Sequence, residues 1–126
     1  MKIRGRKAIG RKSEELACDF LMSRGQTIME KNWTSGHLEV DIISENEEGL
    51  HFIEVKSLLA PLDGILPQDK VGRLKQRHIS DAAMQYLKEH PFPGEKEVFF
   101  DIITVIFDKD QISLKYFPKA WIPMYT

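Results

Sequence analysis

The sequence predicts a single α/β domain, in which a mixed central sheet is flanked by helices and the elements follow the order αβββαββ. Three observations predict this fold class. Apolar residues at helical spacing alternate with short strand-like runs, a polar turn joins two of these runs, and one later run is apolar almost throughout. With 126 residues, the chain suits one domain, 1–126, and is too short for two ordinary ones.

The first helix is predicted from Ser13 to Arg24, because Ser13 can cap its start and Gly25 can end it. Its apolar stripe recurs at helical spacing and consists of Leu16, Ala17, Phe20 and Leu21. Residues 1–10 precede this helix and are rich in Lys and Arg. We expect them to form a flexible, basic N-terminal arm.

Strands are predicted next, from Gln26 to Trp33, Leu38 to Ser44 and Leu50 to Ser57. The polar turn Glu45 to Gly49 should join the last two into an antiparallel hairpin. After a loop with Pro and Gly, a second helix is predicted from Gln68 to Glu89.

Two further strands complete the predicted sheet. The run from Glu97 to Phe107 is nearly continuously apolar, as expected of a strand covered on both faces. Asp108-Lys109-Asp110 makes a turn into a last strand from Gln111 to Phe117. The aromatic segment from Phe117 to Pro123 is expected to dock on the domain or on a second subunit.

Composition excludes several classes of protein. No stretch approaches the ~20 apolar residues that a membrane span needs, and no apolar region follows the basic N-terminus as in a signal peptide. Cys18 is the lone cysteine and lies in an apolar helical pattern, which favours an inert buried thiol in a reducing compartment. We therefore expect a cytoplasmic protein with no membrane partner.

The charged residues are unevenly distributed, although the net charge is only −1. Basic residues precede the first acid, a second basic group opens the second helix, and the stretch from Glu39 to Glu54 between them contains acids and no Lys or Arg. Charge alone leaves two explanations open, ordinary solvated surface and a phosphate-binding rim around a metal centre. The candidate nucleic-acid-binding residues are Arg6, Lys7, Arg11, Lys12, Arg73, Lys75 and Arg77.

Glu54 and Lys56 are charged residues inside an apolar strand. Side chains two apart in a strand share a face, so Glu54 and Lys56 point one way while Val55 points the other. Burying charge costs free energy unless something compensates it. A salt bridge at a strand end is one explanation, and a chemical site is the other.

Asp41 favours the chemical site. It lies in the neighbouring apolar strand, and the hairpin turn should bring it beside the strand of Glu54. Carboxylates at ~4 Å repel by about 4 kcal/mol at an effective dielectric constant near 20, which a divalent cation would relieve. Asp41, Glu54 and the backbone carbonyl of Val55 would give Mg²⁺ or Mn²⁺ the oxygen ligands that such ions prefer. A partly exposed acidic sheet edge is the alternative.

Other residues are weaker candidates. Glu14 could join the site if the first helix packs near the hairpin. Asp101 lies inside an apolar strand, where pairing with a buried donor is favoured over a role as metal ligand. Trp33 and Trp121 could stack on bases, although packing is the more common use of such side chains.

Glu54-Val55-Lys56 after Asp41, with Glu14 upstream, resembles the catalytic pattern of the PD-(D/E)xK nucleases, which include Holliday-junction resolvases. The chain is more closely similar to the YraN family of bacterial proteins. The matching residues are Gly10, Glu14, Ala17, Leu21, Gly25 and Asn32; Glu39-Val40-Asp41-Ile42-Ile43; Phe52-Ile53-Glu54-Val55-Lys56; Gly64, Val71, Lys75, Ala83, Tyr86 and Leu87; and Phe100-Asp101. The chain departs from the family pattern at Ser13, Leu38, Ser57-Leu58 and Phe99, with the loss of two arginines.

The resemblance implies a restriction-endonuclease-like fold and catalytic residues at Glu14, Asp41, Glu54 and Lys56. The first hypothesis is a metal-dependent nuclease that hydrolyses phosphodiester bonds of structured or branched DNA. The second is a non-catalytic nucleic-acid-binding protein that keeps the nuclease fold, and the third is a partner-binding scaffold. Junction-cutting relatives work as symmetric dimers, so a homodimer is one expectation.

Overall fold

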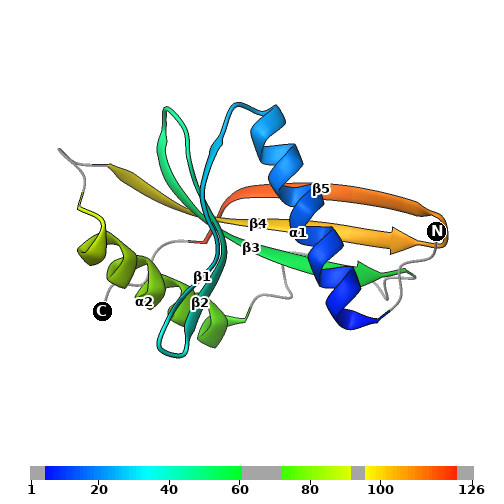
Figure 1. Ribbon diagram of the computed structural model, residues 1–126, viewed down its shortest axis with the longest axis horizontal. Coiled ribbons are helices and arrows are strands. Elements are labelled where there is room, and N and C mark those ends of the chain that lie inside the picture. Colours follow the sequence, from blue (N-terminus) through cyan, green and yellow to red (C-terminus); the bar gives the residue numbers. More distant parts are fainter. Residues whose placement is uncertain (1–4, 61–71, 92–95, 122–126) are drawn as a thin grey trace.

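A single five-stranded mixed sheet, with one helix packed on each face, organises the protein (Figure 1). The computed structural model describes residues 5–60, 72–91 and 96–121. The elements are α1 (Arg6–Ser23), β1 (Thr27–Ser35), β2 (Leu38–Glu45), β3 (Gly49–Leu59), α2 (Arg73–Glu89), β4 (Glu97–Asp108) and β5 (Gln111–Trp121). The predicted fold class and the predicted element order are both confirmed.

The strands lie in the order β1-β2-β3-β4-β5. Neighbours are antiparallel except β3 and β4, which pair in parallel and are connected through α2. β4 is buried over most of its length because the sheet is covered on both sides there. This burial explains the long apolar run in its sequence.

Side chains that alternate along the strands pack into two apolar cores, one on each face of the sheet. Ile53 of β3 packs with Ala17 and Leu21 of α1, whereas Phe52 packs with Ala83 and Tyr86 of α2. Glu54 therefore projects from the face that α2 covers, like Phe52 two residues before it.

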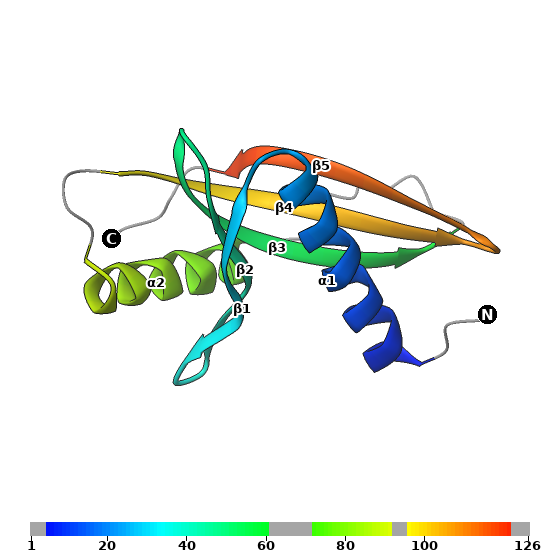
Figure 2. The same cartoon turned by 45° about the horizontal axis from the view of Figure 1, so that its top comes forward.

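The sheet divides between β2 and β3, and this fork is the feature that positions the candidate site. β1 pairs with β2 as far as the hairpin tip, where Ser35 faces Leu38. β2 pairs with β3 only from Glu45 and Leu50 to Ile42 and Ile53. Beyond Ile42 the β1–β2 hairpin turns away from β3 (Figures 1 and 2). Asp41 and Glu54 are the first residues of each branch.

α1 begins at Arg6, seven positions before the predicted start at Ser13. Lys and Arg are good helix formers, so the basic segment continues the helix. Ser13 lies fully buried inside the helix, and its Oγ is 2.6 Å from Ser57 Oγ, so it is not the N-cap. Residues 6–10 of the predicted arm are thus helical, and residues 1–4 lie outside the described part of the chain.

α2 begins at Arg73, after an extended Gly72. The predicted start at Gln68 and the loop before it lie outside the described residues. At the other end of the chain, β5 extends four residues beyond its predicted end and includes Pro118, which an edge strand tolerates.

The tryptophans and Cys18 serve in packing. Trp121 stacks on Phe100, with ring centroids 5.3 Å apart, and Trp33 meets Tyr86 edge-on at 5.3 Å. Cys18 of α1 is buried in the core between this helix and the sheet, as expected, and this burial raises the pKa of its thiol. Neither of the described helices has the length and apolar character needed to cross a bilayer.

Candidate functional site

Two carboxyl groups meet at the fork of the sheet. Asp41 and Glu54 lie close enough to share a hydrogen bond between their side chains. Asp41 Oδ2 also accepts the backbone N–H of Val55 at 2.8 Å, and this contact holds the two branches of the fork together. Glu54 is only 4% exposed, and Asp41 beside it is half-buried.

This crowding changes the acidity of Asp41. Burial raises the pKa of its carboxyl group, and the neighbouring charge of Glu54 raises it further, to about 7. The hydrogen bond from Val55 acts in the opposite direction without offsetting the other two effects. Deprotonating Asp41 near neutral pH therefore carries a substantial free-energy cost.

We expect Asp41→Asn to stabilise the metal-free protein at pH 8 by about 1–2 kcal/mol. The folded pKa of Asp41, about 7, lies above the unfolded value near 4, so the folded state binds the proton more tightly. The stability that comes from this proton is fully present below about pH 4 and is lost as the pH rises through about 7. Asn carries no charge, keeps an oxygen acceptor for Val55, and is indifferent to pH.

Thermal unfolding in metal-free buffer at pH 5 and pH 8 measures this effect. The advantage of Asp41→Asn over the wild type should be small at pH 5 and larger at pH 8. Asp108→Asn, at an exposed position, is the matched control and should show no such dependence. An equal difference between variant and wild type at both pH values would contradict the prediction.

Two ammonium groups contact the other acid of the pair. Lys56 Nζ lies 3.4 Å from Glu54 Oε1, and Lys75 Nζ lies 3.7 Å from the same oxygen. Lys56 comes from β3 itself, whereas Lys75 comes from the first turn of α2. Within the described chain, no cationic side chain lies at ion-pair distance from Asp41. Positive charge is thus concentrated on the Glu54 side of the fork.

Glu14 approaches the fork from α1. It accepts a hydrogen bond from Asn32 Nδ2 at 3.2 Å. Burial raises the pKa of Glu14, and the nearby charges of Asp41 and Glu39 raise it further. The negative charges of Glu14 and Asp41 therefore interact. Over the described ranges, however, no three acidic, histidine or cysteine side chains gather tightly enough to form a metal-binding group.

Most of the predicted phosphate-binding residues lie on the first turns of the two helices. Arg6, Lys7 and Arg11 are exposed on α1, where Lys12 is half-buried, and Arg73 is exposed at the start of α2. Arg77 is paired with Asp81 of its own helix at 3.5 Å. Both helices start on the side to which the β1–β2 hairpin turns (Figure 1). In the described structure, Lys75 is the member of this predicted set that contacts an acid of the fork.

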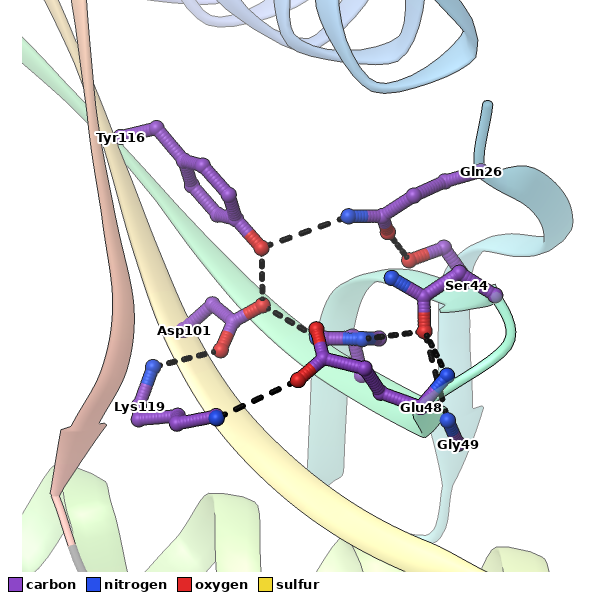
Figure 3. Close-up of polar contacts among 9 residues, drawn as sticks. Gln26, Ser44, Glu48, Gly49, Asp101, Tyr116 and Lys119 are labelled. Carbon is purple, nitrogen blue, oxygen red and sulfur yellow. Dashed lines mark hydrogen bonds and ion pairs between the residues drawn. The ribbon is translucent and has the colours of Figure 1, made fainter. Parts of the chain in front are cut away.

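A second polar cluster lies at the opposite end of the β2–β3 hairpin, and Figure 3 shows it. Asp101 is fully buried and accepts three hydrogen bonds, from Tyr116 Oη at 2.5 Å, His51 Nδ1 at 2.6 Å and the Lys119 backbone N–H at 2.9 Å. Burial, with Asp101 as the next cause, raises the pKa of Tyr116. The interpretation of Asp101 as a structural acid paired with buried donors is confirmed.

His51 is the central residue that the sequence did not reveal. Its Nε2 lies 3.0 Å from Asn46 Oδ1, an oxygen that also accepts the backbone N–H groups of Glu48 and Gly49 in the turn. A lone histidine between Leu50 and Phe52 carries no local signal of these partners. The cluster fastens the turn of the hairpin to β4 and β5, away from the fork.

The model of the uncharacterised protein family UPF0102 matches residues 13–105, a stretch that contains Glu14, Asp41, Glu54 and Lys56. The chain belongs to this family. A UPF0102 protein of Anaeromyxobacter dehalogenans is 34% identical over 117 residues, which are 93% of this chain and 86% of that protein. Another, from Bacteroides fragilis, is 35% identical over 115 residues, 91% of this chain and 93% of that protein. The predicted relationship to the YraN family, which is UPF0102, is confirmed.

One solved structure with a similar fold is that of Pyrococcus furiosus SfsA in complex with Ca²⁺. The likeness covers 89% of the UPF0102 chain and 63% of SfsA, less than two thirds of its length. The TM-score is 0.42 and the sequence identity is 11%.

Proposed function

We propose that this protein is a cytoplasmic, divalent-metal-dependent nuclease that hydrolyses phosphodiester bonds of structured or branched DNA. The observation that supports this proposal best is the close approach of the Asp41 and Glu54 carboxyl groups, with Lys56 beside them at the fork. The resemblance of these residues to the PD-(D/E)xK pattern supports the same chemistry.

The carboxyl pair fits a hard divalent cation. Burial and the neighbouring charge of Glu54 raise the pKa of Asp41, and an ion between the two carboxylates would compensate both effects. In a strand, the N–H and C=O of one residue point to the same side, so the carbonyl of Val55 faces Asp41 as its N–H does. Two carboxylates and one carbonyl are a ligand set that Mg²⁺ or Mn²⁺ accepts while keeping positions for water and substrate.

Hydrolysis replaces one phosphorus–oxygen bond by another. The oxygen of water forms a bond to phosphorus and gives up a proton, the ester bond breaks, and the departing sugar oxygen takes up a proton. When bound, the cation supplies Lewis-acid chemistry, which acidifies water and neutralises phosphate charge. Lys56, whose side chain is 28% exposed, can reach substrate and stabilise the negative charge that develops on the phosphate oxygens.

The remaining residues have supporting roles in the proposal. Glu14 of α1 adds negative charge near Asp41 and so strengthens cation binding. The exposed basic residues on the first turns of both helices would contact the DNA backbone, which they attract without reading sequence. Two cuts in a branched substrate need two sites, so a homodimer is part of the proposal.

A panel of single-stranded, duplex and four-way-junction DNA, incubated with Mg²⁺ or Mn²⁺, tests the function. We expect the wild type to cut the junction, and we expect Asp41→Ala and Lys56→Ala to abolish cutting. Lys88→Ala, which changes an exposed lysine at the far end of α2, should cut like the wild type. Absence of cleavage with both metals, or cleavage that persists in Asp41→Ala, would refute the proposal.

A nucleic-acid-binding protein without catalytic turnover is the second candidate. The pairing of Lys56 and Lys75 with Glu54 favours it, because this acid is already compensated without a cation. Binding of junction DNA that is insensitive to chelator and gives no cleavage would identify this role.

A further inference from the structure

Glu54 and Asp41 differ in how their charges are compensated. Two ammonium groups contact a single oxygen of Glu54, whereas the described contacts of Asp41 are Glu54 itself and the N–H of Val55. Two cations on one oxygen are more than an ordinary ion pair needs. One of them is therefore available for another partner whenever a different positive charge reaches Glu54.

We propose that Lys75 exchanges partners: it pairs with Glu54 in the absence of a divalent cation and binds a phosphate group of the substrate once the cation occupies the fork. This inference rests on the proposed function and extends it, because it assigns to α2 a residue that links metal binding to substrate binding.

Electrostatics favours the exchange. A dication and an ammonium group ~5 Å apart repel strongly in a partly buried site, where the effective dielectric constant is well below that of water. Lys75 Nζ, 3.7 Å from Glu54 Oε1, would lie within this range of a cation bound to the carboxylate. The ammonium group is expected to leave Glu54 and to move toward negative charge elsewhere.

Lys75 is the lysine better able to move. Its side chain is 43% exposed and extends from the first turn of a helix on a flexible four-carbon stem. The side chain of Lys56 is 28% exposed and projects from the same strand as Glu54, two residues away. Lys56 therefore stays near the reacting centre, and Lys75 turns outward to the phosphate that approaches the fork.

The exchange makes metal and DNA binding cooperative. Without the cation, Lys75 is paired with Glu54 and contributes little to the affinity for DNA. With the cation, Lys75 adds one phosphate contact. By linkage, DNA must then raise the affinity for the cation by the same factor.

Fluorescence anisotropy with labelled four-way-junction DNA tests the proposal, in Ca²⁺ and in EDTA over a range of salt concentrations. In Ca²⁺, Lys75→Met should weaken binding about tenfold and reduce the salt slope by about 0.9, the value for one phosphate contact. In EDTA, the same variant should bind within about twofold of the wild type. Lys75→Arg should keep most of the affinity in Ca²⁺, and the control Lys88→Met should behave as the wild type in both buffers.

A titration with Mn²⁺ alone gives a second readout, without DNA. Lys75→Met should bind Mn²⁺ several-fold more tightly than the wild type, because a repelling charge has been removed. Equal losses of DNA affinity in Ca²⁺ and EDTA, no loss in either, or unchanged Mn²⁺ affinity would overturn the exchange.

Measurements on the wild type distinguish a failure of this inference from a failure of the proposed function. If the wild type does not cleave junction DNA with Mg²⁺ or Mn²⁺, the proposed function fails and the exchange fails with it. If it cleaves but binds junction DNA with the same affinity in Ca²⁺ and in EDTA, only the exchange fails. If its affinity rises in Ca²⁺ and Lys75→Met keeps the full rise, only the exchange fails.

Discussion

Lys56→Met should lower the rate of Mg²⁺-dependent DNA cleavage by about 10³-fold, with little change in the KM for DNA. The ammonium group lies beside Glu54 at 3.4 Å, where it can stabilise charge that appears only as the phosphorus–oxygen bonds change. An interaction that acts mainly in the transition state affects kcat and not binding. Single-turnover cleavage with enzyme in excess measures the chemical step directly.

The same variant should fold normally, which separates catalysis from stability. Lys56 is partly exposed, and such ion pairs contribute about 0–1 kcal/mol. Lys56→Arg keeps the charge but changes the geometry of the donor, so we expect partial activity. If Lys56→Met cleaves DNA as fast as the wild type, or loses activity only in proportion to unfolding measured by circular dichroism, the catalytic role is wrong.

Local sequence patterns predicted the order of elements because each pattern reflects a local physical requirement. The polar turn before Gly49 indicated the β2–β3 hairpin, and the apolar run of β4 indicated a strand covered on both faces. The start of α1 was mispredicted for a reason that no local pattern contains. Ser13 looks like a helix cap, but its hydroxyl contacts Ser57, 44 positions away along the chain.

The candidate site was only partly predictable. Strand alternation placed Glu54 and Lys56 on one face, and the hairpin placed Asp41 beside them. The fork itself was not visible in the sequence, because strand divergence depends on how the β1–β2 hairpin packs against α2. For the same reason the contact of Lys75 with Glu54 could not be foreseen, although the residue was recognised as part of a basic rim.

The second large effect is expected in the buried cluster, where Asp101→Asn should destabilise the protein by about 3–5 kcal/mol. The two oxygens of Asp101 accept hydrogen bonds from Tyr116, His51 and the Lys119 backbone. Asn offers one oxygen and one amide group, so at least one of these donors would face another donor. Urea unfolding measures the loss, which is large against the 5–15 kcal/mol of a typical domain.

His51 explains why this loss should exceed that of an ordinary buried hydrogen bond. Its two ring nitrogens lie 2.6 Å from Asp101 Oδ2 and 3.0 Å from Asn46 Oδ1, so the ring links the buried carboxyl group to the turn of the hairpin. Replacing Asp101 with Asn takes the carboxylate acceptor away from the buried His51 ring and the Tyr116 hydroxyl, whereas Asp81→Asn merely removes an exposed pair with Arg77. Asp81→Asn should therefore change stability by less than about 1 kcal/mol. If Asp101→Asn also loses less than about 1 kcal/mol, His51 is held by packing against Phe99 and not by the charge of Asp101.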